Sequence, residues 1–185
     1  MFIQTEDTPN PATLKFLPGA PVMQTGVVDF ETADAAQTSP LATMIFGVGG
    51  VERVFLGADF ISVTKAAEAD WRTLKIKVIA AIVDHDQSGL PIVAQSPEAA
   101  PTDSEADSDI IKQIKELLDF RVRPAVARDG GDITFHSFEP DTGIVRLNMR
   151  GSCAGCPSST MTLKAGIENM FRHFIPEVSR VEQVI

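Results

Sequence analysis

Polar and hydrophobic positions alternate most regularly between residues 144 and 150. There, Val145, Leu147 and Met149 are separated by polar residues, which is the pattern of a strand with one buried face. The predicted elements of this region are a helix from residue 108 or 109 that kinks or restarts at Pro124, strands at 133–139 and 144–150, a helix from about residue 158 to Pro176, and a strand within 178–185. The predicted order is therefore α-β-β-α-β.

The first 93 residues alternate strand and helix patterns as well. Ser39-Pro40 is typical of a helix start, because Ser can cap the helix and Pro suits its first turn. Asp70 is expected to cap a second helix, with Trp71 in the core. The predicted strands lie at 2–5, 13–17, 51–56 and 60–64. Both halves of the chain are thus predicted to be small α/β sandwiches, and the fold class is α+β.

Residues 84–108 form the clearest boundary in the chain. They contain three prolines, six acidic residues and no basic residue. The part from 94 to 107 is predicted to be a flexible, acidic linker, because it cannot bury enough apolar surface to offset its ordering entropy. Leu90–Val93 are expected to pack on the first domain. The predicted organisation is an N-terminal domain at 1–93, a linker at 94–107 and a C-terminal domain at 108–185.

Charge and hydropathy exclude several classes of function. The net charge of −9 and the sequence pI near 4.7 disfavour binding to nucleic acid. No apolar run approaches the ~20 residues that cross a membrane. The start of the chain lacks the pattern of a secretory signal or a transit peptide, so a cytoplasmic location is expected, or the mitochondrial matrix if a targeting segment was removed.

The candidate chemistry lies in Cys153 and Cys156, the two cysteines of the chain. They stand in a Gly-rich loop between a predicted strand and a predicted helix, so both thiols can turn toward one metal centre. Gly155 permits the tight curl of such a loop, and Pro157 suits the first helical position. The helix N-terminus favours a thiolate or an anionic cluster, and Arg150 and Lys164 are expected to add positive potential.

Four interpretations of this cysteine pair stay open on spacing alone. A thioredoxin-type redox pair uses the same C-x-x-C, with Cys153 as the attacking thiol, but the flanking sequence does not suggest that fold. A zinc site needs four ligands, which leaves a zinc bridging two chains. Inert thiols are disfavoured by the loop context. An iron–sulfur cluster commonly needs four thiolates, so a chain with two must borrow two more, most simply from a symmetric partner.

Two segments carry a resemblance to a known family. Gly151–Ser159, with Arg123-Pro124 and Asp129–Asp132, resembles the C-terminal domain of the NifU-like (Nfu-type) iron–sulfur cluster scaffold and carrier family. The opening, Phe2–Phe16, resembles the N-terminal domain of its two-domain form.

The resemblance implies a [4Fe–4S] cluster, with [2Fe–2S] as the alternative, that bridges a homodimer through Cys153 and Cys156. It also implies a carrier rather than an enzyme, with an upstream cluster donor and apo-protein recipients. The front domain would recognise recipients or regulate the carrier. Three other features have plain structural interpretations: Asp129–Asp132 as a helix stop and turn, and His136 and His173 as residues without a ligand role.

Overall fold

The structure is a computed structural model that describes residues 2–94, 109–154 and 157–184, and the side chains of 157–160 are outside that description. Cys156 and nearly all of the predicted linker at 94–107 therefore lie outside the described residues. The chain divides into two compact units, Met1–Ala100 and Pro101–Ile185, each with its own helices and sheet. The predicted α+β class with two domains is confirmed.

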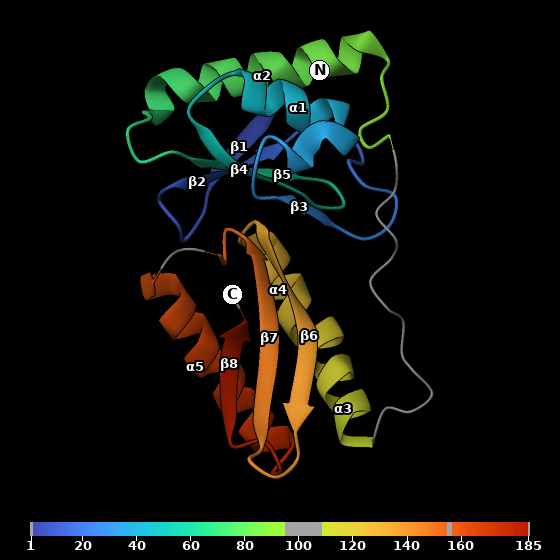
Figure 1. Ribbon diagram of the computed structural model, residues 1–185, viewed down its shortest axis with the longest axis vertical. Helices are drawn as coiled ribbons and strands as arrows, with labels where there is room; N and C mark the ends of the chain where they lie inside the picture. Colours follow the sequence, from blue (N-terminus) through green and yellow to red (C-terminus); the bar gives the residue numbers. More distant parts are fainter. Residues whose placement is uncertain (1, 95–108, 155–156, 185) are drawn as a thin grey trace. The chain divides into compact units, whose positions relative to one another are not determined.

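The front unit is an antiparallel five-stranded sheet covered by helices (Figure 1). Its strands, in the spatial order β1-β2-β5-β4-β3, are β1 (Gln4–Asp7), β2 (Thr13–Leu17), β5 (Ile61–Lys65), β4 (Val51–Leu56) and β3 (Val28–Phe30). The short 3-10 helix η1 (Ala35–Thr38), α1 (Pro40–Gly47) and α2 (Trp71–Ser88) lie on one face. The strand β3 was not predicted, and β1 begins two residues later than expected.

Side-chain caps begin both main helices of this unit, as predicted. The Ser39 hydroxyl accepts a hydrogen bond from the Ala42 N–H at 3.1 Å, and Asp70 accepts one from the Arg72 N–H at 3.2 Å. The end of α2 differs from the prediction, because the helix continues through Asp84–Ser88 and ends where Gly89 adopts a φ of 67°. His85 falls within the predicted boundary region 84–108, but the structure buries it on the inner face of α2.

The segment that follows α2 runs back over the front unit. Ile92 and Val93 pack against its core, as expected for Leu90–Val93. The Ser39 hydroxyl donates to the Ile92 carbonyl at 2.5 Å, and the Ala94 N–H donates to the Thr38 carbonyl at 2.8 Å. Ala94, the first residue of the predicted linker, therefore belongs to the front unit.

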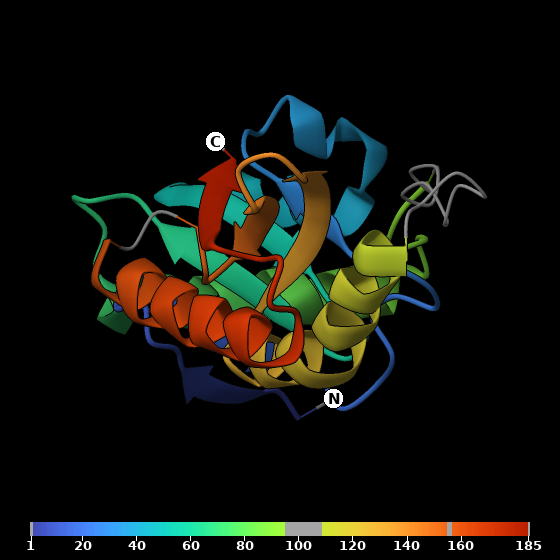
Figure 2. The same ribbon diagram turned by 90° about the horizontal axis from the view of Figure 1, so that it is seen from below.

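The rear unit has three strands with helices on one side. The antiparallel pair is β6 (Gly131–Glu139) and β7 (Ile144–Gly151), and β8 (Arg180–Val184) runs parallel to β7. The helices are α3 (Asp109–Leu117), the π-helical turn η2 (Leu118–Val122), α4 (Arg123–Arg128) and α5 (Pro157–Phe174). Figure 2 shows α5 and the run from α3 to α4 on the same side of the strands. The predicted order α-β-β-α-β is confirmed.

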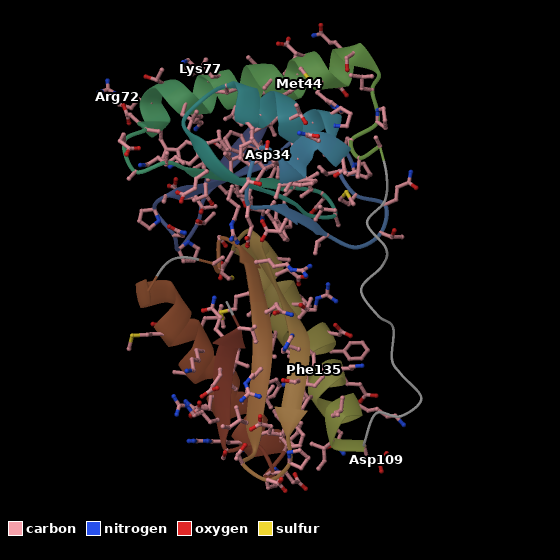
Figure 3. All side chains as sticks on the ribbon, in the orientation of Figure 1. Asp34, Met44, Arg72, Lys77, Asp109 and Phe135 are labelled. Atoms are coloured by element: carbon pink, nitrogen blue, oxygen red, sulfur yellow. The ribbon has the colours of Figure 1, made fainter. Side chains whose placement is uncertain are left out.

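Local sequence explains these rear elements well. Buried and half-buried residues alternate along the whole of β7, as the hydrophobic pattern predicts. Pro124 lies in the first turn of α4, and the π-helical turn before it is the predicted kink. On β6, Phe135 packs under α3, where the Lys115 ammonium lies 5.8 Å from the centre of its ring (Figure 3).

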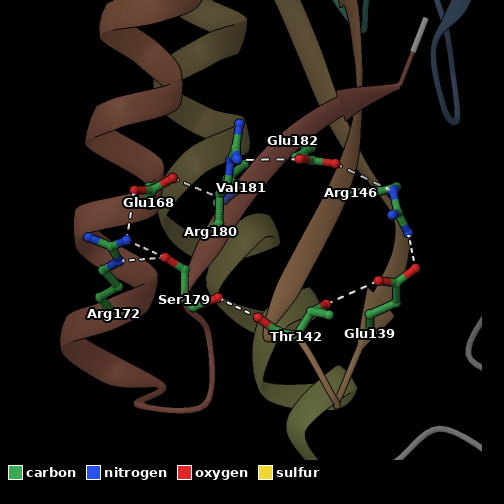
Figure 4. Close-up of polar contacts among 9 residues, drawn as sticks. All are labelled: Glu139, Thr142, Arg146, Glu168, Arg172, Ser179, Arg180, Val181 and Glu182. Carbon is green, nitrogen blue, oxygen red and sulfur yellow. Dashed lines mark hydrogen bonds and ion pairs between the residues drawn. The ribbon is translucent and has the colours of Figure 1, made fainter.

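A polar network ties together the end of the rear unit where β7 begins (Figure 4). Arg146 on β7 contacts Glu139 at 2.7 Å and Glu182 at 3.7 Å, and so links all three strands. On α5, Arg172 donates through Nε to the Ser179 carbonyl at 2.8 Å. These contacts fasten α5 and β8 to the β6–β7 hairpin.

Candidate metal centre

Cys153 lies in the loop that joins β7 to α5. The strand ends at Gly151, where a φ of 63° turns the chain, and the Ala154 N–H donates to the Gly151 carbonyl at 3.1 Å. The Cys153 side chain is buried and belongs to the hydrophobic core of the rear unit. Pro157 opens α5, as predicted. Cys156, the other predicted ligand, precedes Pro157 in sequence but lies outside the described residues.

The Asp129–Asp132 segment forms the floor beneath Cys153. Gly131 pairs with Gly151 across the β6–β7 ladder. A Cβ at Gly131 would lie 2.7 Å from the Cys153 Sγ, so the thiol fits only above a glycine. Ser152 fastens the loop to the same segment, since its hydroxyl donates to the Asp129 carbonyl at 2.5 Å.

This role of the segment was missed in the sequence analysis. Gly130, with a φ of 81°, supplies the predicted turn after α4. Gly131 does not have a positive φ. It must be glycine because a Cβ there would collide with the Cys153 Sγ and the Arg150 carbonyl oxygen. The available signal was that two glycines stand together. The turn after α4 requires only Gly130, so a second glycine at 131 indicates that another part of the chain comes close to its backbone.

An ion pair holds the start of β6 against the start of α4. Arg123 contacts Asp132 through two nitrogens, at 2.8 and 3.1 Å, and Asp119 at 3.0 Å. The hydrogen bond to Asp132 raises the pKa of Arg123 although partial burial opposes that shift. Asp132 is buried and directly follows Gly131. The pair therefore fixes the strand position on which the cysteine rests.

The surroundings of Cys153 keep its thiol protonated at neutral pH in the metal-free chain. Burial raises its pKa to about 11; the negative charges of Asp129 and Asp132 add to the rise, and a hydrogen bond with Ser152 opposes it. Arg150 and Lys164, which were expected to add positive potential, are not among the groups that shift this pKa. A protonated, buried thiol is a poor attacking group, because the thiolate is the reactive form.

The described residues contain no group of three or more His, Cys, Asp and Glu side chains that could hold a metal ion. His85 is buried in α2, and His136 and His173 are exposed, so none of the three joins Cys153. The candidate thiolate ligands of the chain are therefore the two cysteines. Within the described ranges, no helix is long and apolar enough to span a membrane.

Comparisons with known proteins match both units. The family model for the N-terminal domain of scaffold protein Nfu/NifU matches residues 3–89, and the model for the NifU-like domain matches 114–182. The chain is 52% identical to NifU-like protein 4, mitochondrial, of Arabidopsis thaliana, over 99% of the chain and 66% of that protein. It is also 52% identical to the human NFU1 iron-sulfur cluster scaffold homolog, mitochondrial, over 100% of the chain and 72% of that protein.

A solved structure is also similar, over about half of the chain. The solution NMR structure of a NifU-like protein from Saccharomyces cerevisiae is 24% identical and covers 52% of this chain and 87% of its own, with a TM-score of 0.47. The names of the plant and human relatives include "mitochondrial", so they give no support to the expected cytoplasmic location. The two domain matches and the identity to these relatives show that the chain belongs to the NifU-like (Nfu-type) iron–sulfur cluster scaffold family, in its two-domain form.

Proposed function

We propose that the chain binds a [4Fe–4S] cluster between two copies of itself, through Cys153 and Cys156 of each, and transfers it to apo-proteins. The cluster is cargo in this proposal, and the chain acts as a carrier rather than as an enzyme. The observation that carries the proposal is the shortage of ligands: the chain has two cysteines, and the described residues add no other metal-binding group. A cluster with four thiolate ligands then takes two from each of two chains.

The position of the loop supports a site between molecules. Cys153 lies two residues after the end of β7, in the loop that leads to α5, and its Sγ lies over Gly131. Its own domain covers the Cys153 thiol on the side of Gly131, so the proposed second pair of thiolates would approach from another side. A cluster held by only two thiolates from each chain is easier to release than one enclosed by four from a single fold.

Transfer would proceed by ligand exchange. Each cysteine thiol of a recipient loses a proton as its sulfur binds iron, and each departing thiolate of the carrier gains one. Four exchanges move the cluster without a change in its charge or oxidation state. Burial in the core, which favours the protonated form of Cys153, assists the departure of that ligand.

Two other functions remain as alternatives. A dithiol oxidoreductase that attacks through Cys153 is disfavoured by the raised pKa of that thiol. A zinc bridge between two chains would use the same four thiolates and differs only in the metal. For location, the names of the relatives favour the mitochondrion over the cytoplasm.

Anaerobic reconstitution with iron and sulfide separates these functions. The proposal expects a brown dimer with about two irons per chain. A colourless monomer that cycles a disulfide would favour the oxidoreductase. Zinc retained in place of iron under the same conditions would favour the zinc bridge.

Single substitutions test the ligand assignment. Cys153→Ala and Cys156→Ala are each expected to abolish iron binding while the apo chain stays folded. Ala154→Ser, between the two cysteines, is the matched control and should retain the iron. Full iron content in either cysteine variant would show that the assignment is wrong.

A further inference from the structure

The outer face of α2 in the front unit carries an apolar stripe exposed to solvent. The inner face of the helix is buried through Leu74, Val78 and Ile82, among others. On the opposite side, Ile76, Ala80 and Val83 follow helical spacing; Ile76 is 69% exposed, Ala80 is exposed and Val83 is half-buried. A helix that covers a sheet normally presents polar residues to water, and none of these three residues packs in the hydrophobic core of the front unit.

Charges on this helix are arranged against its dipole. Arg72, Lys75 and Lys77 lie in its first two turns, and its first turn contains no acidic residue. Asp84 and Asp86 lie near its C-terminal end. The N-terminus of a helix favours negative charge and the C-terminus positive charge, so this order destabilises an isolated helix.

None of these charges is neutralised within the described part of the chain. No ion pair there involves any of the five side chains, whereas the front-unit cations Lys15 and Arg53 are both paired with carboxylates. Within α2, no basic residue has an acidic residue three or four positions away. Figure 3 shows Arg72 and Lys77 on α2, projecting away from the sheet.

We propose that α2 pairs with the α2 of a second copy, antiparallel, and that this contact makes a dimer without any cluster. An antiparallel pair places the basic half of each helix beside the acidic half of the other. Lys77 then faces Asp84 of the second copy, and Lys75 faces its Asp86. In each pair the two sequence positions lie at equal distances on either side of the point between Ala80 and Ala81. One two-fold axis through that point therefore generates both pairs.

Pairing would offset both unfavourable features of the single helix, its charge order and its exposed apolar residues. The cations at the start of one α2 lie beside the negative C-terminal pole of the other. The stripe with Ile76, Ala80 and Val83 meets its own copy across the axis and leaves water. A surface that complements itself in both charge and apolar pattern favours a second copy as the occupant. Asp84 and Asp86 on the same helix disfavour an anionic membrane.

Sedimentation of the full-length apo chain in chelator, from about 1 to 200 µM, tests the proposal, because a contact of this small area gives a weak dimer. A concentration-dependent dimer without iron is expected. Lys77→Glu is expected to raise its dissociation constant at least about tenfold, since symmetry places the repulsion at two contacts. The double variant Lys77→Glu/Asp84→Lys restores the two symmetry-related contacts between positions 77 and 84 with the charges exchanged. Its dissociation constant should return to within about threefold of the original value.

Two further variants complete the test. Asp59→Lys changes the charge of the same unit on an exposed turn away from α2, and should leave the dimer unchanged. Ala80→Cys, in a chain whose two native cysteines are replaced by serine, is expected to form a disulfide-linked dimer on oxidation, whereas Asp59→Cys should not.

Three results would overturn the proposal. The first is an apo chain that stays monomeric at every concentration, whether or not it binds phosphatidylserine vesicles. The second is a dimer that forms only with iron. The third is a double variant, Lys77→Glu/Asp84→Lys, that fails to restore the dimer affinity lost in Lys77→Glu. The second of these would leave the proposed cluster function intact. A cluster-free dimer that takes up no iron would instead refute that function and support this contact.

Discussion

Gly131→Ala would test whether the Asp129–Asp132 segment positions the cysteine loop. The added methyl group would lie 2.7 Å from the Cys153 Sγ and 2.8 Å from the Arg150 carbonyl oxygen. The backbone nitrogen of Cys153, at 3.2 Å, closes the space from a third side. Two of these three atoms belong to the backbone, so rotation of a side chain cannot relieve the contact.

The magnitude follows from this geometry. Relief requires a shift of β6 against β7, or movement of the Cys153 loop away from the floor. Forcing one methyl group into a packed site costs about 1–3 kcal/mol, and we expect the upper part of that range because backbone atoms must move. A cost of about 2–3 kcal/mol would make the rear unit open about 30 to 150 times more often, since each 1.4 kcal/mol is a factor of about ten.

Hydrogen exchange measured by mass spectrometry resolves this effect by region. The amides of β6 and β7 should exchange faster in the apo Gly131→Ala chain, and iron content after reconstitution should fall. The front unit provides an internal control, because the single tryptophan, Trp71, lies in α2 and its fluorescence should not change.

Gly166→Ala is the matched control for the same substitution. Gly166 lies within α5, and a Cβ there would meet no atom within 4 Å. Alanine in a helix is expected to stabilise the rear unit by about 0.5–1 kcal/mol. Normal exchange and full iron content in Gly131→Ala would refute the argument that Cys153 requires a glycine beneath it.

Three further predictions concern single contacts. Asp132→Asn removes the charge that Arg123 binds at two points and should destabilise the apo rear unit by about 2–3 kcal/mol in urea unfolding. Ser39→Ala removes the cap of α1 and the hydrogen bond to Ile92, and should cost the front unit about 1–2 kcal/mol, measured through tryptophan fluorescence. Because burial raises the pKa of the Cys153 thiol to about 11, iodoacetamide should label it at pH 8 at least about a hundredfold more slowly than a peptide cysteine, with a rate that rises up to about pH 11.

Elements with strong local signals could be predicted from the sequence. The alternation along β7 and the Ser39-Pro40 start of α1 need no information from distant residues. The end of α2 was misplaced because its last turn is polar, and what extends the helix is the burial of His85 against its own unit. The strand β3 has only three residues, Val28–Phe30, and is defined by its pairing with β4.

The candidate ligands could be predicted from the sequence, but the residues that position Cys153 could not. The loop between a strand and a helix, and the start of α5 at Pro157, follow from local residues. The contact of Cys153 with Gly131 joins positions 22 residues apart in the chain, and spacing alone does not show it. The raised pKa of Cys153 also depends on burial, a property of the folded domain.

The strand β7 separates the ion pairs of Arg146 from the cysteine loop. At its first residues the strand carries the exposed ion pairs of Arg146, and at its last residue it reaches the cysteine loop. Eight residues of strand span roughly 25 Å, several times the screening length in physiological salt. The charges of the Arg146 ion pairs therefore lie too far from Cys153 to act on its thiol through the solvent, and a substitution that breaks these pairs should leave the pKa of Cys153 unchanged.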